Sequence, residues 1–133
     1  HMTAARYDLT IDQGSDFSLE LTVKENGTAK SLTKWHGRAH LRKSKEDTTT
    51  AGKFSFDMNH DAGGNQPAES TGKMTMSLPY TTTDDLVAGI YHYDVEIYYN
   101  NSATAATAET ISAVTQVKRL FGGTATVTRE ITR

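Results

Sequence analysis

The sequence predicts an all-β protein, folded as an antiparallel β-sandwich of about seven to nine short strands. Segments in which apolar and polar residues alternate recur along the whole chain, and turn-forming residues separate them. No stretch repeats apolar residues with the 3.6-residue period of a long helix. Threonine and other β-branched residues abound while proline occurs only 2 times, a composition that favours strands.

The clearest alternating segment is residues 89–99, around which we expect the chain to be organised. Its odd positions from 91 to 99 are apolar or aromatic, and His92, Asp94 and Glu96 lie between them. This pattern is typical of a long strand with one buried face. Residues 81–88 precede it and predict one short helical turn, after which Gly89 supplies backbone angles that other residues avoid.

The other elements follow from the same pattern. We expect strands at residues 6–11, 17–23, 35–42, 54–58, 74–78, 114–121 and 124–131, with turns at 12–14, 25–27 and Gly122-Gly123. Loops are expected at 43–52, 60–71 and 100–110. The shared parity within each strand predicts a core of Phe17, Leu19, Leu21, Trp35, Leu41, Phe54, Phe56, Met76, Tyr91, Tyr93, Val95 and Ile97.

Length and composition restrict the function. The 133 residues suit one domain, expected at residues 3–133, while His1 is interpreted as a cloning scar and Met2 as the natural start. The net charge of −2 and the absence of long basic runs disfavour nucleic acid and anionic membranes as partners. No apolar run approaches a membrane span, no signal peptide is recognised, and there is no cysteine for metal or redox chemistry.

Two patterns in the sequence resemble metal sites. Asp57, Asn59 and Asp61 alternate as at the start of a calcium loop, but Ala62 and Ala68 replace the glycine and glutamate that such a loop needs. An Asn/Asp-rich turn is the preferred interpretation.

His36 and His40 lie four residues apart, which on a strand separates them by about 13 Å. One zinc ion cannot take both as neighbouring ligands, and nothing in the sequence requires His60 or His92 to approach either. We therefore expect no metal and no cofactor.

No catalytic constellation is recognised, and an enzyme is not expected. Asp84-Asp85 is interpreted as helix capping, no Gly-x-Ser-x-Gly motif occurs, and the Gly-Gly pairs lack a phosphate-loop context. Tyr80, Tyr98 and Tyr99 could form an aromatic platform for sugar, but packing is preferred. On the outer face, Arg38, His40 and Arg42 are expected to face Asp94 and Glu96.

Two features resemble immunoglobulin-like sandwiches. The helical turn, glycine and tyrosine at residues 81–91 resemble the tyrosine corner that precedes a central strand, with Tyr91 at the tyrosine position. Trp35 precedes that strand by the spacing of the core tryptophan of these domains. The resemblance implies an immunoglobulin-like antiparallel sandwich.

Four further segments carry a second resemblance: residues 7–23, 32–42, 89–97 and 123–133. In this order they resemble small structural proteins of tailed-bacteriophage virions, found in tail, baseplate and neck. They are similar, more loosely, to the N-terminal β-sandwich domain of phage upper-baseplate proteins. In the last segment Arg129 stands where proline is expected, and the Ala/Thr-rich loop before Val114 looks like an insertion.

The phage resemblance implies a non-enzymatic virion building block, present in several copies and assembled in a bacterial host cytoplasm. It would dock other virion proteins through loops and edge strands; the oligomeric state of the isolated domain is not indicated. We expect the terminal segment 124–133 to be one such edge. The candidate docking loop comprises Asn100, Asn101, Ser102, Thr104, Thr107 and Glu109. The alternative function is a glycan-binding β-sandwich module.

Overall fold

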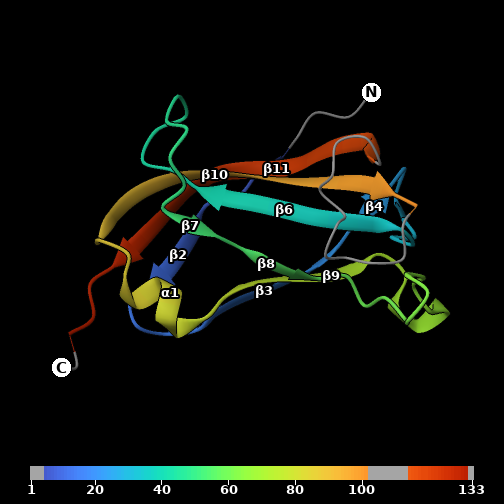
Figure 1. Cartoon of the computed structure of the whole chain (residues 1–133), viewed down its shortest axis with the longest axis horizontal. Coiled ribbons are helices and arrows are strands. Elements are labelled where there is room, and N and C mark those ends of the chain that lie inside the picture. Colours follow the sequence, from blue (N-terminus) through green and yellow to red (C-terminus); the bar gives the residue numbers. More distant parts are fainter. Residues whose placement is uncertain (1–4, 102–113, 132–133) are drawn as a thin grey trace.

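The computed structural model describes residues 5–101 and 114–131 and arranges their strands in two facing layers (Figure 1). The larger sheet has the order β1 (Ala5–Arg6), β11 (Val114–Thr128), β10 (Gly89–Asn100), β6 (Trp35–Leu41) and β7 (Gly52–Lys53), with β2 (Leu9–Asp12) also beside β11. The smaller sheet has the order β3 (Phe17–Thr22), β9 (Lys73–Leu78) and β8 (Ser55–Asp57). The predicted immunoglobulin-like β-sandwich is confirmed.

Short elements connect these strands. The hairpin of β4 (Lys24–Glu25) and β5 (Thr28–Ala29) turns at Asn26 and Gly27, whose φ angles of 54° and 79° suit the predicted Asn-Gly turn. The 60–71 loop contains the 3₁₀ turn η1 (Ala68–Ser70), and α1 (Tyr80–Asp84) is the expected helical turn. It begins one residue before the predicted segment.

The tyrosine corner forms as the sequence predicts. Gly89 has a φ of +147°, which lets the chain swing from the segment after α1 into β10. The hydroxyl of Tyr91, which is buried, donates a hydrogen bond to the Val87 carbonyl oxygen at 2.6 Å. This bond ties the start of the central strand to the residues before it.

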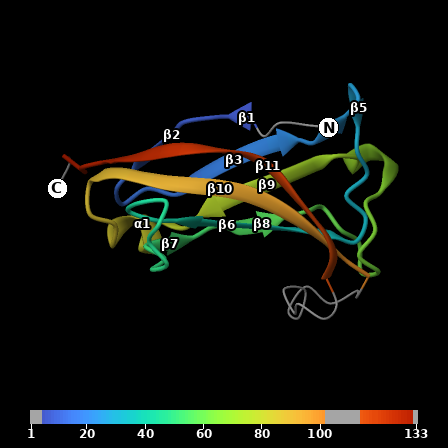
Figure 2. The same ribbon diagram turned by 90° about the horizontal axis from the view of Figure 1, so that it is seen from above.

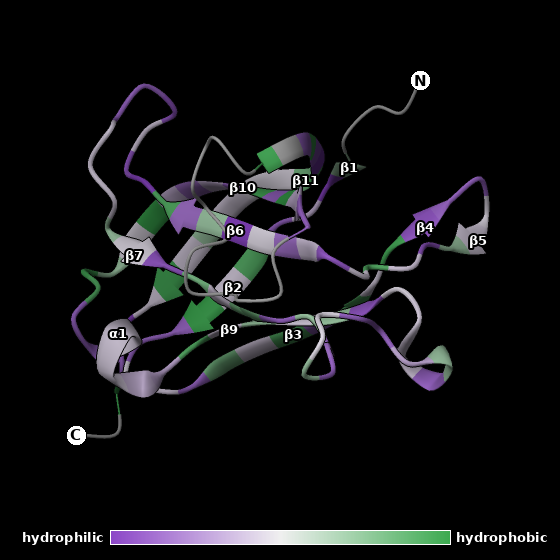
Figure 3. Ribbon diagram, turned by 45° about the vertical axis from the view of Figure 1, so that its right-hand side comes forward, coloured by the Kyte–Doolittle hydropathy of each residue, from purple (hydrophilic) through white to green (hydrophobic). Residues whose placement is uncertain are grey.

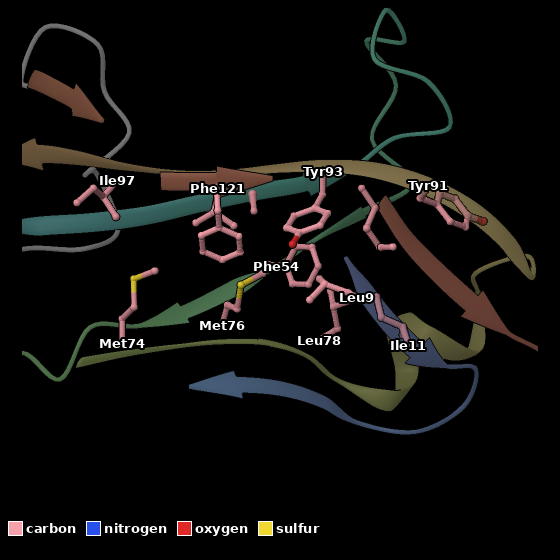
Figure 4. Close-up of a cluster of buried hydrophobic side chains, with 14 of the residues drawn as sticks. Leu9, Ile11, Phe54, Met74, Met76, Leu78, Tyr91, Tyr93, Ile97 and Phe121 are labelled. Carbon is pink, nitrogen blue, oxygen red and sulfur yellow. The ribbon is translucent and has the colours of Figure 1, made fainter. Parts of the chain in front are cut away.

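The core lies between the two sheets, and Figure 4 shows its side chains meeting there. Trp35, at the first position of β6, is buried and contacts Tyr99 edge-on, with ring centroids 5.5 Å apart. Most of the predicted core is buried, but four of its members are only partly buried and pack against the buried cluster. These four are Phe17, Leu19, Leu21 and Phe56.

The prediction of two strands around Gly122-Gly123 is wrong, because β11 runs through both glycines without a turn. A Cβ atom at Gly122 would lie 2.7 Å from the Tyr93 carbonyl oxygen, and one at Gly123 would lie 2.8 Å from the Tyr7 carbonyl oxygen. The glycines therefore permit close backbone approach on both sides of one strand. Figure 2 shows β10 and β11 lying side by side over most of their length.

The prediction that residues 124–133 form a free edge is also wrong. The described part of that segment within β11 lies between β10 on one side and β2 on the other. Both β1 and β2 run parallel to β11 and break at Tyr7-Asp8, so the predicted first strand is divided in two. At the break, Asp8 Oδ1 accepts a hydrogen bond from the Thr124 backbone N–H at 3.0 Å, which lowers the pKa of Asp8.

The two long edges of the sandwich differ as a result. At one edge the chain passes from β7 in the larger sheet through Phe54 to β8 in the smaller sheet, so it joins the two layers. The Phe54 backbone N–H donates to the Ala39 carbonyl oxygen at 3.0 Å. At the other edge, β1 and β2 pair with β11 and leave β3 paired with β9 alone. We call these the joined edge and the open edge.

Candidate functional site

The open edge is the strongest candidate for a functional surface. Strand β3 has 6 residues and lies at the end of its sheet. Within residues 5–101 and 114–131, no backbone hydrogen bond joins residues 17–22 to any strand other than β9. One side of β3 therefore presents a row of N–H and C=O groups that another strand can bind.

The side chains of β3 alternate as the sequence predicts. Ser18, Glu20 and Thr22 are exposed on the outer face, whereas the apolar residues between them are only half-buried. A strand in the middle of a sheet would have its apolar face covered by neighbours on both sides. Here the missing neighbour leaves the apolar face of β3 open along its free side.

An apolar pocket of about 290 Å³ lies between the end of β3 and the strands opposite. Tyr7, at the break between β1 and β2, is 49% exposed there, and its ring meets Phe121 edge-on with centroids 6.1 Å apart. Figure 3 shows the β4–β5 hairpin projecting beyond the sandwich just past β3. The pocket is lined by Ala5, Arg6, Tyr7, Leu21, Thr22, Val23, Lys24, Met74, Leu120 and Phe121.

A second, polar groove of about 800 Å³ lies on the outer face of the larger sheet, beside the loop before β7. Arg38 Nε and Glu96 Oε1 lie 2.9 Å apart, so the predicted pairing of these two residues is confirmed. Asp94 instead pairs with Arg119 of β11, with Nη2 and Oδ1 2.5 Å apart. Both pairs are partly exposed cross-strand contacts, so they stabilise the sheet only modestly.

The remaining predicted members of this charged face, His40 and Arg42, contact each other and the neighbouring loop. Arg42 Nη2 lies 3.2 Å from Nδ1 of His40, and Thr50 Oγ1 lies 3.4 Å from the same nitrogen. The backbone of Arg42 bridges to His92 through two hydrogen bonds of 2.9 and 2.7 Å. The groove combines cations and anions without an excess of either sign.

His36 is on the outer face, as expected, but it is only 6% exposed, because Tyr98 and His60 cover it. Its ring centroid lies 5.3 Å from that of His60, and its Nε2 has no hydrogen-bond partner. Burial, followed by the proximity of His60, lowers the pKa of His36. Among the described residues, no group of three or more His, Cys, Asp or Glu side chains is placed to hold a metal ion.

The Asp57–Asp61 segment forms a turn whose carboxylates bind the backbone. Asp57 Oδ1 accepts a hydrogen bond from the Asn59 N–H at 2.9 Å. Asp61 Oδ1 accepts from the N–H groups of Asn65 at 3.0 Å and Gly63 at 2.8 Å, which lowers the pKa of Asp61. These bonds explain the alternating oxygens without a cation.

The interpretation of Asp84-Asp85 as helix capping holds only for the C-terminal end of α1, where Asp85 is the cap residue. Asp84 is the last residue of α1 and Asp85 follows it. The N-terminus of the helix is bound instead by Asp16 from the β2–β3 turn, whose Oδ1 accepts from the Tyr80 N–H at 2.7 Å. The sequence could not show this contact, because the two residues are 64 positions apart.

The three tyrosines of the alternative sugar platform do not gather on one exposed surface. Tyr98 is 3% exposed beneath Arg38, whose guanidinium carbon lies 5.1 Å from the ring centroid, and Tyr99 packs against Trp35. Tyr80 is exposed, at the start of α1. Packing is therefore the correct interpretation of Tyr98 and Tyr99.

The predicted docking loop begins later than expected. Asn100 is the last residue of β10, is 1% exposed and donates its backbone N–H to the Lys34 carbonyl oxygen at 2.9 Å. Its side chain is thus not on a docking surface, whereas Asn101 is exposed. The other predicted members, Ser102, Thr104, Thr107 and Glu109, lie outside the described residues.

Comparison with known proteins adds little to this geometry. No protein-family model matches the chain, and a search of curated proteins gave no match. Among solved structures, the chain is similar to AggA, the major subunit of aggregative adherence fimbriae type I from Escherichia coli. The match has 13% identity and a TM-score of 0.33, and covers 91% of this chain and 89% of AggA. A likeness of this size carries no information on function. None of the described helices is long and apolar enough to cross a membrane.

Proposed function

We propose that this protein is a non-enzymatic subunit of a multi-copy protein assembly, and that it binds its neighbours through the open edge. The observation that carries the proposal is the unpaired side of β3, with a half-buried apolar face beside an apolar pocket. An added strand would satisfy the free N–H and C=O groups of β3 and cover its apolar side chains at once. The open edge therefore offers both hydrogen bonds and apolar burial to one partner.

The finer proposal is that the assembly is the virion of a tailed bacteriophage, in its tail, baseplate or neck. It is supported by the ordered resemblance of the four sequence segments to small virion structural proteins. The assembly would form in the bacterial host cytoplasm, and other virion proteins would be the partners.

Lysine-directed cross-linking of virions purified from the phage that encodes this chain tests the proposal. Lys24 lines the apolar pocket and Lys73 begins β9, whereas Lys45 lies in the outer-face groove. We expect intermolecular cross-links from Lys24 and Lys73 to other virion proteins or other copies. Cross-links from Lys45 alone would place docking on the outer face instead. Absence of the chain from the purified virions would contradict the finer proposal.

A further inference from the structure

We propose that the open edge binds a second copy of the same chain, by antiparallel pairing of β3 with β3 across a two-fold axis. This inference deepens the proposed function, because it rests on the open edge being a docking surface. It names the partner and the register. The two three-stranded sheets would join into one continuous sheet of six strands.

The pattern of β3 favours the register that is centred on the strand. Directly opposite residues of an antiparallel pair point to the same face, so half-buried residues must meet half-buried residues. With Leu19 on the two-fold axis, Phe17 of one copy lies opposite Leu21 of the other, and Ser18 lies opposite Glu20. Moving the axis to Glu20 also preserves the faces, but it places two carboxylates directly opposite each other.

Charge along the strand is compatible with the antiparallel direction. The outer face begins with exposed Asp16, carries Glu20 near its middle and continues to exposed Lys24 after the end of β3. With Leu19 on the axis, Asp16 of one copy lies opposite Thr22, and its diagonal neighbours in the other copy are Lys24 and Glu20. Each end of the strand therefore meets one opposite and one like charge of its partner, so charge does not oppose this pairing.

The apolar pocket has a suitable occupant in this register. Leu21 lines the pocket, and Phe17 of the second copy lies directly opposite Leu21. The Phe17 ring of each copy is half-buried against Phe54, with centroids 6.1 Å apart, so its outer side remains to be covered. Pairing brings that uncovered side to the mouth of the partner's pocket.

The size of the contact predicts its strength. Six residues of strand extend for about 20 Å, which buries less area than the roughly 1,200–2,000 Å² of a stable interface. The isolated dimer should therefore be weak and seen at high protein concentration. Several copies held in one assembly would raise the effective concentration and stabilise the pair.

Disulfide trapping tests the register, because the natural chain contains 0 cysteines. Ser18→Cys and Glu20→Cys are prepared as separate variants, both at exposed positions. Mixed at high concentration under mild oxidation, they should give a covalent dimer that joins position 18 of one chain to position 20 of the other. Each variant alone should give much less, because positions 18 and 18 of the paired copies are about 8 Å apart, too far for a disulfide.

Charge substitution tests the same contact without cross-linking. Ser18→Glu places a carboxylate opposite Glu20 of the partner and should raise the dimer dissociation constant several-fold in sedimentation equilibrium. Ser18→Lys should lower it, and the double variant Ser18→Glu with Glu20→Lys should restore association. Circular dichroism and melting temperature serve as controls, because both positions are exposed and the fold should not change.

Other outcomes overturn the inference in distinct ways. Self-linking of Glu20→Cys alone would show the other register. A wild-type chain that stays monomeric up to millimolar concentration, and shows no link at position 18 or 20, would overturn homotypic pairing. If Lys24 and Lys73 were then still cross-linked to a different protein in virions, the proposed function would stand with a heterologous strand as the occupant. If neither disulfide trapping nor cross-linking in virions gave a link at the open edge, that edge would be ruled out as a docking surface.

Discussion

The joined edge and the open edge belong to the same sandwich but satisfy the backbone differently. At the joined edge, the segment from β7 to β8 crosses between the layers, and Phe54 is buried with its N–H bonded to Ala39. At the open edge, the N-terminal strands follow β11 and leave β3 without a second neighbour. In this sandwich the chain closes one edge and leaves the other available for binding.

Side-chain packing shows the same difference. The Phe56 ring covers Gly37 so closely that a Cβ atom there would lie 2.7 Å from the ring carbon Cγ. On the open side, the apolar residues of β3 remain half-exposed, and a pocket lies beside Leu21 and Val23. We therefore expect stability to depend on the joined edge and association to depend on the open edge.

The largest expected effect is on stability at the joined edge. Phe54→Ala removes a buried ring from between the sheets and should lower the free energy of unfolding by about 3–5 kcal/mol. Leu19→Ala at the open edge should cost less, about 1 kcal/mol, because that side chain is only partly buried. Urea denaturation of both variants measures the difference. Equal losses would contradict the distinction between the two edges.

A smaller loss is expected where the N-terminal strands attach to β11. Gly123→Ala places a methyl group against the Tyr7 carbonyl oxygen and should cost about 1–3 kcal/mol. Thr126→Ala, in the same strand, is the matched control and should cost less. Thermal unfolding compares the two. Gly123→Ala at wild-type stability would indicate that residues 5–8 do not lie against β11.

The free energy of unfolding should also depend on pH, because His36 lies against His60 of the 57–66 turn. Folding lowers the pKa of His36 by burial and by the nearby His60, and Lys34 adds positive charge. The unfolded chain therefore binds a proton at pH values where the folded chain does not. The stabilising contribution is full above about pH 6.5, the ordinary histidine pKa, and is lost progressively as the pH falls below it.

Melting temperatures between pH 7.5 and 5 test this expectation. Other groups also titrate in acid, so the informative quantity is the difference between variants. His36→Phe should weaken the acid destabilisation, whereas His92→Gln, in the outer-face groove, should leave it unchanged. An identical pH profile for wild type and His36→Phe would show that His36 does not contribute.

The smallest expected effect is that of calcium. The Asp61 carboxylate already accepts two backbone hydrogen bonds, so millimolar calcium should leave the melting temperature unchanged. A rise of several degrees that Asp61→Asn abolishes would contradict this expectation.

The parts of the fold that were predictable are those governed by local patterns. The period-two alternation gave the strands and their buried faces, and the segment ending at Tyr91 gave the tyrosine corner. The Gly122-Gly123 pair was misread, because a glycine pair in a turn and one at a close backbone approach look alike in sequence. Only the neighbours Tyr93 and Tyr7 distinguish the two cases.

The candidate site could be predicted only in part. The alternation of β3 was clear in the sequence, but a strand's own residues do not tell which strands lie beside it. The free edge was assigned to residues 124–133, whereas parallel pairing of β1 and β2 with β11 covers that segment and exposes β3. Similarly, His36 has the expected outward parity, yet Tyr98 and the distant His60 bury it.

Amide hydrogen exchange along β3, measured by NMR as a function of protein concentration, tests the central claim most directly. In dilute solution, the amides of β3 that point away from β9 should exchange fast, while those bonded to β9 are protected. At high concentration, the fast amides should become protected and those of β10 should not change. Uniform protection of residues 17–22 in dilute solution would show that β3 has no free edge and would contradict the account.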